Sequence, residues 1–217
     1  MKDIVIIGAG GFAREVAWLI ENINKSKGQW NLLGFIDDDE NLHGEKLNGY
    51  DILGDIDYLN KLKNEVYCVI AIGDGKTRKQ IVDRINKNRK FATLIHPDVD
   101  LSSTNLIGEG CIICCGTILT VNVALKNHII INLDCTIGHD AILEDYTTLM
   151  PSVNVSGNVF IDKYTTVGTG TNIIQGLRIG KNSIIGAGSV VIRDIEDNCT
   201  VVGNPGRIIK KLIKVKN

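Results

Sequence analysis

In the second half of the chain, the apolar positions repeat with a period of six. From Ile107 onward an aliphatic residue begins each of fifteen consecutive hexapeptides, and the fifth position is small, β-branched or aliphatic. This period fits neither an α-helix nor the alternation of a single strand. It predicts a triangular coil of three short strands, in which the first position points inward and residues eighteen apart stack in neighbouring coils.

The second position of many hexapeptides is Gly, Asn or Asp. These residues adopt the left-handed backbone conformation at the lowest cost, so we expect the sharp corners of the coil to use them. The chain has 23 glycines against three prolines, and 5% of its residues are aromatic. This composition agrees with many tight turns around a core of branched aliphatic side chains.

The first hundred residues have a different pattern, in which apolar strands alternate with amphipathic helices. The segment KDIVIIGAGGFAREVAWLIENI predicts a buried strand, a glycine turn and a helix. The segments NLLGFID, VYCVIAIGD and KFATLIHP predict further strands, and TRKQIVDRINKN predicts a helix. Alternating strands and helices form a small parallel sheet whose ligand lies at the carboxyl ends of the strands.

Together these patterns predict a chain of mixed class, α/β followed by β. We expect a small Rossmann-like domain over residues 1–97 and a parallel β-helix over residues 98–203. Residues 204–217 form a tail that contains the basic run RIIKKLIKVKN. We interpret this run either as a solvated helix end or as a segment that attracts a phosphorylated ligand.

The composition argues against several classes of function. A formal charge of −1 gives no electrostatic basis for nucleic-acid binding. No apolar run reaches the roughly 18–20 residues of a membrane span, and the first residues lack the regions of a signal peptide, so we expect a cytoplasmic protein. The run CIICC resembles half of a zinc knuckle, but no second half follows. We therefore expect small core residues there and no metal.

The turn Gly8–Gly11 opens the first predicted helix. Its backbone can approach a ligand closely, and the helix amides point toward an anion. A nicotinamide dinucleotide is one interpretation, with Asp37 at the place of a ribose contact. A packing turn without a ligand is another. The predicted sheet ends near residue 97 with no second mononucleotide half, which argues against the dinucleotide.

The hexapeptides and the ending IIGAGSVVIRDIEDNCTVVGNPGRII resemble the hexapeptide-repeat acyltransferases. The resemblance implies a left-handed β-helix, with the GNP turn closing the last coil beside a coenzyme A site. Joined to a short Rossmann-like domain, the repeats resemble the bacterial surface-sugar acetyltransferases over essentially the whole chain. That group includes enzymes that N-acetylate the 4-amino group of nucleotide-linked sugars, and the sialic acid O-acetyltransferases.

The resemblance implies an acetyl-CoA-dependent N-acetyltransferase that acts on a UDP-4-amino-4,6-dideoxy sugar in surface glycan biosynthesis. O-acetylation of sialic acid is the alternative. It also implies a homotrimer with active sites between subunits, and an N-terminal domain that holds the sugar nucleotide. The matching positions are Gly10, Gly11, Asp37, Asp38, Gly54 and Gly73, and Phe12 is the substrate position that departs from the family pattern. Several relatives have a histidine where this chain has Phe12, so this sugar contact differs here.

His139, in the hexapeptide IGHDAI, is the candidate general base. At the third position it points away from the coil interior, histidine titrates near neutral pH, and Asp140 would orient its ring. Acetyl transfer also needs an oxyanion donor. Gly157 stacks eighteen residues after His139 and leaves its backbone N–H open to an acetyl carbonyl. The histidine–acid pair and this glycine match catalytic positions of the amino-sugar acetyltransferases.

The resemblance also assigns positions to acetyl-CoA. Thr148 takes the place of a histidine that contacts the acetyl group, and its hydroxyl would donate a hydrogen bond there. Thr169 and Ala187, again eighteen residues apart, match corner positions that contact the coenzyme A arm.

The remaining histidines carry weaker expectations. His128 lies on a corner without an acidic neighbour and is expected at the surface. His96, before Pro97, is interpreted as structural or as a neighbour of the sugar site, and His43 lies in a polar loop. A zinc carbonic anhydrase would need three histidine ligands, and the repeats supply two. A nucleotide-binding scaffold and a redox enzyme remain as alternatives, tested by coenzyme A binding and NAD(H) binding.

Overall fold

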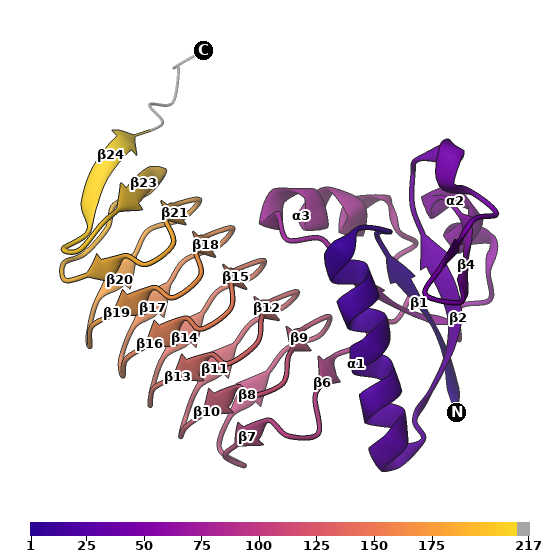
Figure 1. Cartoon of the computed structure of the whole chain (residues 1–217), viewed down its shortest axis with the longest axis horizontal. Coiled ribbons are helices and arrows are strands. Elements are labelled where there is room, and N and C mark those ends of the chain that lie inside the picture. The colour runs from indigo at the N-terminus through magenta and orange to yellow at the C-terminus, as the bar shows by residue number, and fades with distance from the viewer. Residues whose placement is uncertain (212–217) are drawn as a thin grey trace.

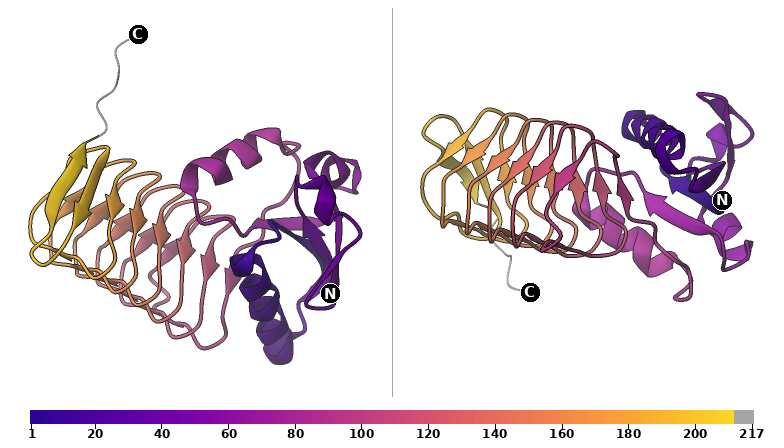
Figure 2. Two further views of the ribbon diagram at one scale, coloured as in Figure 1. Left: turned by 45° about the horizontal axis from the view of Figure 1, so that its top comes forward. Right: turned by 90° about the horizontal axis from the view of Figure 1, so that it is seen from below.

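The computed structural model describes residues 1–211 and consists of an α/β domain joined to a parallel β-helix (Figure 1). Figure 2 shows the α/β domain at one end of the β-helix and the hairpin of β23 (Cys199–Val202) and β24 (Arg207–Lys211) at the other. Among the described residues, no helix is both long and apolar enough to cross a membrane.

The α/β domain contains a five-stranded sheet in the order β3-β4-β2-β1-β5. All neighbours are parallel except the β3–β4 hairpin. Its elements are β1 (Lys2–Ile7), α1 (Gly11–Lys27), β2 (Trp30–Ile36), η1 (Glu40–Leu42), β3 (Lys46–Leu47), β4 (Tyr50–Gly54), α2 (Ile56–Lys61), β5 (Tyr67–Ile70) and α3 (Gly75–Arg84). The sequence pattern predicts β1, β2, β5, α1 and α3, and it does not predict the short β3, β4 and α2.

Apolar side chains cover both faces of this sheet. On one face, the buried side of α1 packs against β1 and β2 in a cluster that continues into Leu94, Ile112 and Ile130 of the β-helix. On the other face, side chains of α2 and α3, such as Ile56 and Ile81, form a separate cluster. Because removing apolar surface from water is the main stabilising term in folding, the first cluster holds the two domains together.

The β-helix consists of three sheets of six, five and eight strands. Strands pair with those eighteen residues along, as Leu119 does with Ile137. First- and fifth-position side chains form one continuous buried core, which confirms the predicted coil. Its two-residue strands are β6 (Leu94–Ile95), β7 (Asp100–Leu101), β8 (Leu106–Ile107), β9 (Ile112–Ile113), β10 (Ile118–Leu119), β11 (Ala124–Leu125), β12 (Ile130–Ile131), β13 (Thr136–Ile137), β14 (Ile142–Leu143), β15 (Thr148–Leu149), β16 (Asn154–Val155), β17 (Phe160–Ile161), β18 (Thr166–Val167), β19 (Asn172–Ile173), β20 (Arg178–Ile179), β21 (Ile184–Ile185) and β22 (Val190–Val191).

The β-helix begins earlier than the hexapeptides indicate. β6 pairs in register with β9, and Ile95 and Leu101 continue the period of six backward from Ile107. The expected boundary at residue 97 therefore lies within the first coil. The prediction of KFATLIHP as the last strand of the α/β sheet is wrong. Phe91 keeps one parallel bridge to Cys68, and the following residues belong to the β-helix because their apolar side chains pack there.

The prediction that second positions form the left-handed corners is also wrong. Positive φ values occur at the fourth position of the hexapeptides, as at Asn122, Asp134 and Asp140. Second-position glycines have another purpose, because a Cβ on Gly138 would lie 2.5 Å from the backbone nitrogen of Gly157 in the next coil. The close approach of neighbouring coils, rather than a backbone corner, requires this glycine.

The described part of the basic C-terminal segment, residues 207–211, is a strand and not a helix end. Residues 207–211 form β24, which pairs antiparallel with β23 and so satisfies backbone groups of both strands. A cis peptide bond joins Asn204 and Pro205 in the intervening GNP turn. The rest of the predicted tail, residues 212–217, lies outside the described residues.

Candidate active site

His139 lies on the corner between β13 and β14, and 48% of its side chain is exposed. Its Nδ1 is 2.8 Å from a carboxylate oxygen of Asp140. Because a carboxylate only accepts, Nδ1 donates and Nε2 keeps its lone pair for a proton. Asn122 donates a further hydrogen bond to Asp140 over 3.2 Å. The hydrogen bonds from His139 and Asn122 lower the pKa of Asp140, which keeps this carboxylate ionised at neutral pH.

Gly157 lies against the His139 ring in the next coil. A Cβ at this position would overlap Nε2 of His139, so only glycine leaves room for the ring. The carbonyl of His139 accepts a hydrogen bond from the backbone of Asn158 over 2.8 Å, which fixes the two coils in register. Within residues 1–211, the N–H of Gly157 donates to no protein acceptor. A potential base and a free backbone donor therefore stand side by side.

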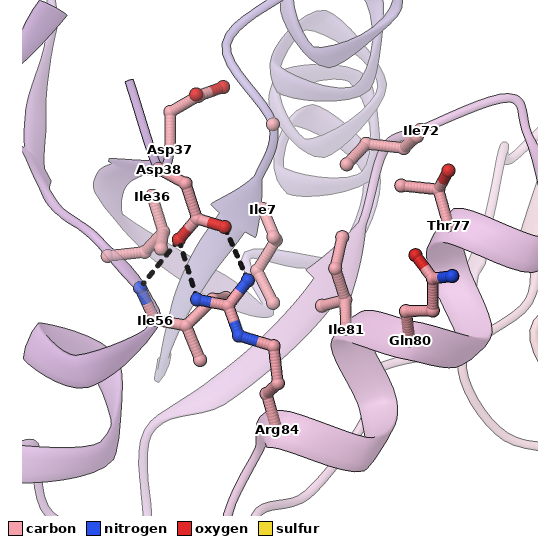
Figure 3. A pocket seen from close by; sticks show the side chains of 11 residues that line it. Ile7, Ile36, Asp37, Asp38, Ile56, Ile72, Thr77, Gln80, Ile81 and Arg84 are labelled. Carbon is pink, nitrogen blue, oxygen red and sulfur yellow. Dashed lines mark hydrogen bonds and ion pairs between the residues drawn. The ribbon is translucent and has the colours of Figure 1, made fainter. Parts of the chain in front are cut away.

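A first cavity, of about 300 Å³, lies at the carboxyl ends of β1 and β2 (Figure 3). In its wall, Nη1 and Nη2 of Arg84 lie 2.5 and 3.1 Å from the carboxylate oxygens of Asp38. This ion pair lowers the pKa of Asp38. Asp37 accepts hydrogen bonds from the backbone of Ala9 over 2.8 Å and of Asp39 over 3.0 Å. The apolar lining consists of Ile7, Ile36, Ile56, Ile72 and Ile81.

Two of the predicted substrate positions line this first cavity, and a third contacts one of them. Asp37 and Asp38 line it, and the carbonyl of Gly54 accepts a hydrogen bond from the backbone of Asp37 over 2.9 Å. Gly10 is the N-cap of α1 and Gly11 its first residue, outside the cavity lining. Sequence reasoning missed Arg84, because an arginine on a polar helix face gives no signal until the helix is placed beside Asp38.

A second cavity, of about 330 Å³, lies between the start of α1 and the eight-stranded sheet of the β-helix. It brings together Phe12, Gly73, Thr148 and Thr169, which the sequence assigned separately to substrate and cofactor. The other lining residues include two polar ones, Glu15 and Asn132. The remaining four are apolar: Ile130, Leu133, Met150 and Pro151.

The hydroxyl of Thr148 has partners within the protein. It donates to the carbonyl of Gly73 over 2.7 Å and accepts from Nη1 of Arg78 over 2.9 Å. The side chain is also buried. A hydroxyl has a single proton to donate, so this arrangement leaves none for an acetyl carbonyl. The expected acetyl contact by Thr148 is therefore not supported, although the residue does line the second cavity.

One chain does not bring all the predicted site residues together. His139, Asp140 and Gly157 occupy the corners between the six-stranded and five-stranded sheets. Thr169 and Ala187 occupy the corners between the eight-stranded and six-stranded sheets, on the side of the second cavity. Neither cavity has His139 in its lining. Within a single chain, the candidate base is thus on a different edge of the prism from the residues expected to bind ligands.

The expectation that His128 lies at the surface is wrong. Its side chain is buried, stacks on Tyr146 with ring centroids 5.1 Å apart, and meets the edge of Phe91 at 4.7 Å. Tyr164 extends the stack one coil further. Burial lowers the pKa of His128 to about 4, helped by the positive charge of Arg78. The spacing of residues 128, 146 and 164 by eighteen is a signal of this ladder that sequence reasoning overlooked.

The cysteines and the remaining histidines include potential metal ligands. Cys111 and Cys114 of the CIICC run are buried. Among the residues that the structure describes, ligand atoms of His96, Asp98 and Cys115 lie within 4.8 Å of one another. The backbone N–H of Asp98 donates to Nδ1 of His96 over 3.1 Å, so this lone pair already has a partner. This hydrogen bond gives His96 a structural role in the corner that follows β6, within the first coil.

The β-helix, the exposed corner at His139 and the α/β domain agree with the acyltransferase family that the hexapeptides resemble. Comparisons with known proteins agree. The family model described as the PglD N-terminal domain matches residues 3–85. A GDP-perosamine N-acetyltransferase of Escherichia coli O157:H7 is 31% identical over 156 residues, which are 71% of this chain and 70% of that protein. A UDP-N-acetylbacillosamine N-acetyltransferase of Bacillus subtilis (strain 168) is 35% identical over 115 residues, 52% of this chain and 51% of that protein.

Solved structures give the same result over nearly the full chain. The acetyltransferase domain of PglB from Neisseria gonorrhoeae FA1090, in complex with acetyl coenzyme A, has a TM-score of 0.88 and 30% identity, covering 96% of this chain and 99% of that one. PerB from Caulobacter crescentus, in complex with CoA and GDP-perosamine, has a TM-score of 0.84 and 27% identity, covering 97% of this chain and 98% of that one. The chain therefore belongs to the hexapeptide-repeat sugar-nucleotide acetyltransferases. This confirms the resemblance seen in the sequence, including the left-handed class of the β-helix.

Proposed function

We propose that the protein transfers the acetyl group of acetyl-CoA to the amino group of a nucleotide-linked amino sugar, with His139 as general base. The proposal rests on the geometry of one corner. There, Nδ1 of His139 is bonded to Asp140, and Nε2 keeps its lone pair and lies against Gly157. The curated relatives named above are N-acetyltransferases, one with a GDP-linked and one with a UDP-linked substrate name. We place the reaction in surface glycan biosynthesis, with a UDP-4-amino-4,6-dideoxy sugar as the first substrate to test.

The chemistry follows from the groups at this corner. The sugar amine attacks the thioester carbonyl and loses its proton to Nε2 of His139, while Asp140 holds the ring by its Nδ1–H. The carbonyl oxygen becomes an oxyanion, and the N–H of Gly157 donates a hydrogen bond to it. The C–S bond then breaks, and the coenzyme A thiolate takes the proton from His139. No covalent enzyme intermediate is needed.

We further propose that the complete site forms between subunits of a homotrimer. The proposal is supported by the separation, within one chain, of His139 from both cavities. The outer face of the five-stranded sheet, next to the His139 corner, carries an apolar row in register: Leu106, Ala124, Ile142 and Phe160. Leu106 is 71% exposed, and a neighbouring chain would bury it. An active monomer, measured by light scattering under assay conditions, would contradict this arrangement.

The two cavities suit the two parts of a sugar nucleotide. The isoleucine walls of the first cavity fit a planar base, and its volume is at the lower end of the roughly 300–1,000 Å³ usual for small-molecule pockets. The second cavity, with Phe12 and mostly apolar lining, fits a deoxy sugar better than a sugar rich in hydroxyl groups. In this proposal Gly73 and Thr169 border the sugar and the coenzyme A arm, respectively.

The test is to follow thiol release from acetyl-CoA with a panel of acceptors. The panel contains UDP- and GDP-linked 4-amino-sugars and sialic acid. We expect turnover with a 4-amino-sugar nucleotide and none with sialic acid. Turnover with sialic acid alone would replace the proposal by O-acetylation. Failure to bind coenzyme A would leave a nucleotide-binding scaffold.

A further inference from the structure

Arg78 is a buried arginine that crosses from one domain to the other. It lies on α3, and only 1% of its surface is exposed. Its Nε donates to the carbonyl of His128 over 3.0 Å, and its Nη2 donates to the carbonyl of Thr147 over 3.1 Å. Both acceptors belong to the β-helix, so two of the three guanidinium nitrogens contact the neighbouring domain.

The third guanidinium nitrogen of Arg78, Nη1, contacts residues of both domains. Nη1 lies 2.9 Å from each of three oxygens: the carbonyls of Ile72 and Gly73, and the hydroxyl of Thr148. The hydroxyl of Thr148 in turn donates to the carbonyl of Gly73 over 2.7 Å. The turn that follows β5 is therefore fixed to the coil of β15 by a closed set of hydrogen bonds.

This turn lies between the two cavities. Ile72 is in the wall of the first cavity and Gly73 is in the wall of the second. The packing around it is close, because a Cβ on Gly75, the first residue of α3, would overlap the backbone carbonyl of Tyr146. A displacement of the turn relative to the β-helix would move both cavity walls together.

All five acceptors of Arg78 are neutral oxygens, and none is a carboxylate. Burial lowers the pKa of Arg78 to about 10, and Asp74 partly offsets this, so the guanidinium is charged at neutral pH. Its planar fork of donors holds five acceptors in one geometry, which an ammonium group cannot reproduce. Lysine at this position would keep the charge and lose the geometry.

We propose that Arg78 is a positioning residue for acetyl transfer, which fixes the turn between the two cavities at a set distance from the β-helix. The proposal rests on the proposed function, since the cavities are those assigned to the sugar nucleotide. In this role Arg78 touches neither substrate nor the reacting atoms. It determines where the α/β domain presents the acceptor, and displacements of about 1 Å in such geometry can cost roughly 10² in rate.

Arg89 provides a matched control within the same chain. It is also buried, and its guanidinium donates to the carbonyls of Leu59, Leu62, Lys63 and Val66, all within the α/β domain. Loss of either arginine leaves buried carbonyl groups without donors and lowers stability. Only the loss of Arg78 changes a contact between the domains.

The experiment compares Arg78→Lys, Arg78→Met and Arg89→Met in the full chain, at a temperature at which each variant is folded. We expect both Arg78 variants to lower kcat roughly tenfold to a hundredfold. The KM for acetyl-CoA should stay within about twofold, as expected for a change that leaves cofactor binding intact. Arg89→Met should lower the melting temperature and keep wild-type kcat. Equal losses of kcat in Arg78→Met and Arg89→Met would overturn the proposal.

Two further measurements test the proposal in other cases. The first is useful if the Arg78 variants do not fold, and the second is useful if the parent protein shows no acetyltransferase activity. Thr148→Val removes one acceptor of Arg78 and the hydrogen bond to Gly73 while keeping a side chain of similar size, and we expect a severalfold loss of kcat. Wild-type kcat in Thr148→Val would count against the proposal. Hydrogen exchange of the amides of residues 72–78 should accelerate in the Arg78 variants and not in Arg89→Met. If the parent protein acetylates no acceptor, the proposed function fails, whereas unchanged exchange in these amides contradicts the role of Arg78 itself.

Discussion

His128 and His139 occupy two corners of the β-helix and have opposite surroundings. His128 follows β11 and His139 follows β13, in hexapeptides with the same backbone repeat. His128 is 4% exposed, lies under the α/β domain and has an Nδ1 without a hydrogen-bond partner in the described structure. His139 has about half of its side chain exposed and has a carboxylate partner.

The difference shows that the repeat determines where a corner is, and that the neighbouring structure determines what the corner does. The α/β domain covers the His128 corner and makes it part of the domain junction, with Phe91 and Arg78 as neighbours. Nothing in the described chain covers the His139 corner, so its imidazole remains accessible to a substrate.

The largest effect is expected at the exposed corner. His139→Ala removes the proposed base and should lower kcat by about 10²–10⁴, the usual contribution of general acid–base catalysis. The melting temperature should stay close to that of the parent, because the side chain is exposed. Thiol release and thermal unfolding measure the two quantities. Parental kcat in this variant would remove His139 from the mechanism.

The buried His128 corner should make the stability of the folded protein sensitive to acid. It should have no direct effect on the acetyl-transfer chemistry. The pKa of folded His128 is about 4, against an ordinary value near 6.5, so the unfolded state binds the extra proton between these values. Stability is therefore greatest above pH 6.5 and is lost as the pH falls toward 4, by about 3 kcal/mol for this group. Denaturant titrations at several pH values measure this loss.

His128→Phe should remove this component of the acid sensitivity while keeping the stack on Tyr146. Phenylalanine does not titrate, and the neighbouring corners already hold aromatic residues at positive φ in Tyr146 and Tyr164. His139→Ala is the control and should keep the parental pH dependence of stability. An unchanged pH dependence in His128→Phe would show that another group is responsible.

Gly157→Ala tests the contact between neighbouring coils at the exposed corner. The backbone of Gly157 is not left-handed, so alanine is acceptable there by conformation, but its Cβ would overlap the ring of His139. The displaced ring should lower kcat roughly tenfold to a hundredfold, since small shifts of reacting groups are costly. Gly176→Ala, in open space one coil along but at positive φ, is the comparison for a purely structural cost. A lower kcat in Gly176→Ala than in Gly157→Ala would show that displacement of the His139 ring is not the cause of the loss.

The smallest effect is expected for Asp140→Asn. Asparagine tolerates the positive φ of this corner, and it removes the charge that orients and stabilises a protonated His139. Because the pair is solvent-exposed, we expect a loss of kcat of about tenfold, below that of His139→Ala. Thiol release from acetyl-CoA measures kcat, and an unchanged kcat would show that Asp140 is dispensable.

The regular parts of the molecule could be predicted because each follows from a local pattern. The inward first position of every hexapeptide and the stacking of Gly157 on His139 are consequences of one period, repeated without interruption. The strand and helix that flank the first glycine turn are equally local. The mistakes concern positions where the period alone does not decide between alternatives, such as the second or the fourth residue of a corner.

Contacts between distant segments could not be predicted in this way. Arg78 and Arg84 lie on the same short helix, and nothing in TRKQIVDRINKN distinguishes them. The structure places Arg78 at the junction with the β-helix and Arg84 on Asp38, because the two side chains point in different directions from α3. The same limit applies to Thr148, whose hydroxyl partners are more than sixty residues away in the chain.

The sequence by itself determined the two-domain plan, the triangular coil, the family and the corner that presents His139 to solvent. Each of these depends on residue type at a fixed short spacing, and such spacing is encoded in consecutive residues. The tertiary structure alone decided that His128 is buried, that Thr148 belongs to the domain junction and that Phe12, Gly73 and Thr169 share one cavity. Those outcomes depend on how the α/β domain packs against the first coils, which no local pattern specifies.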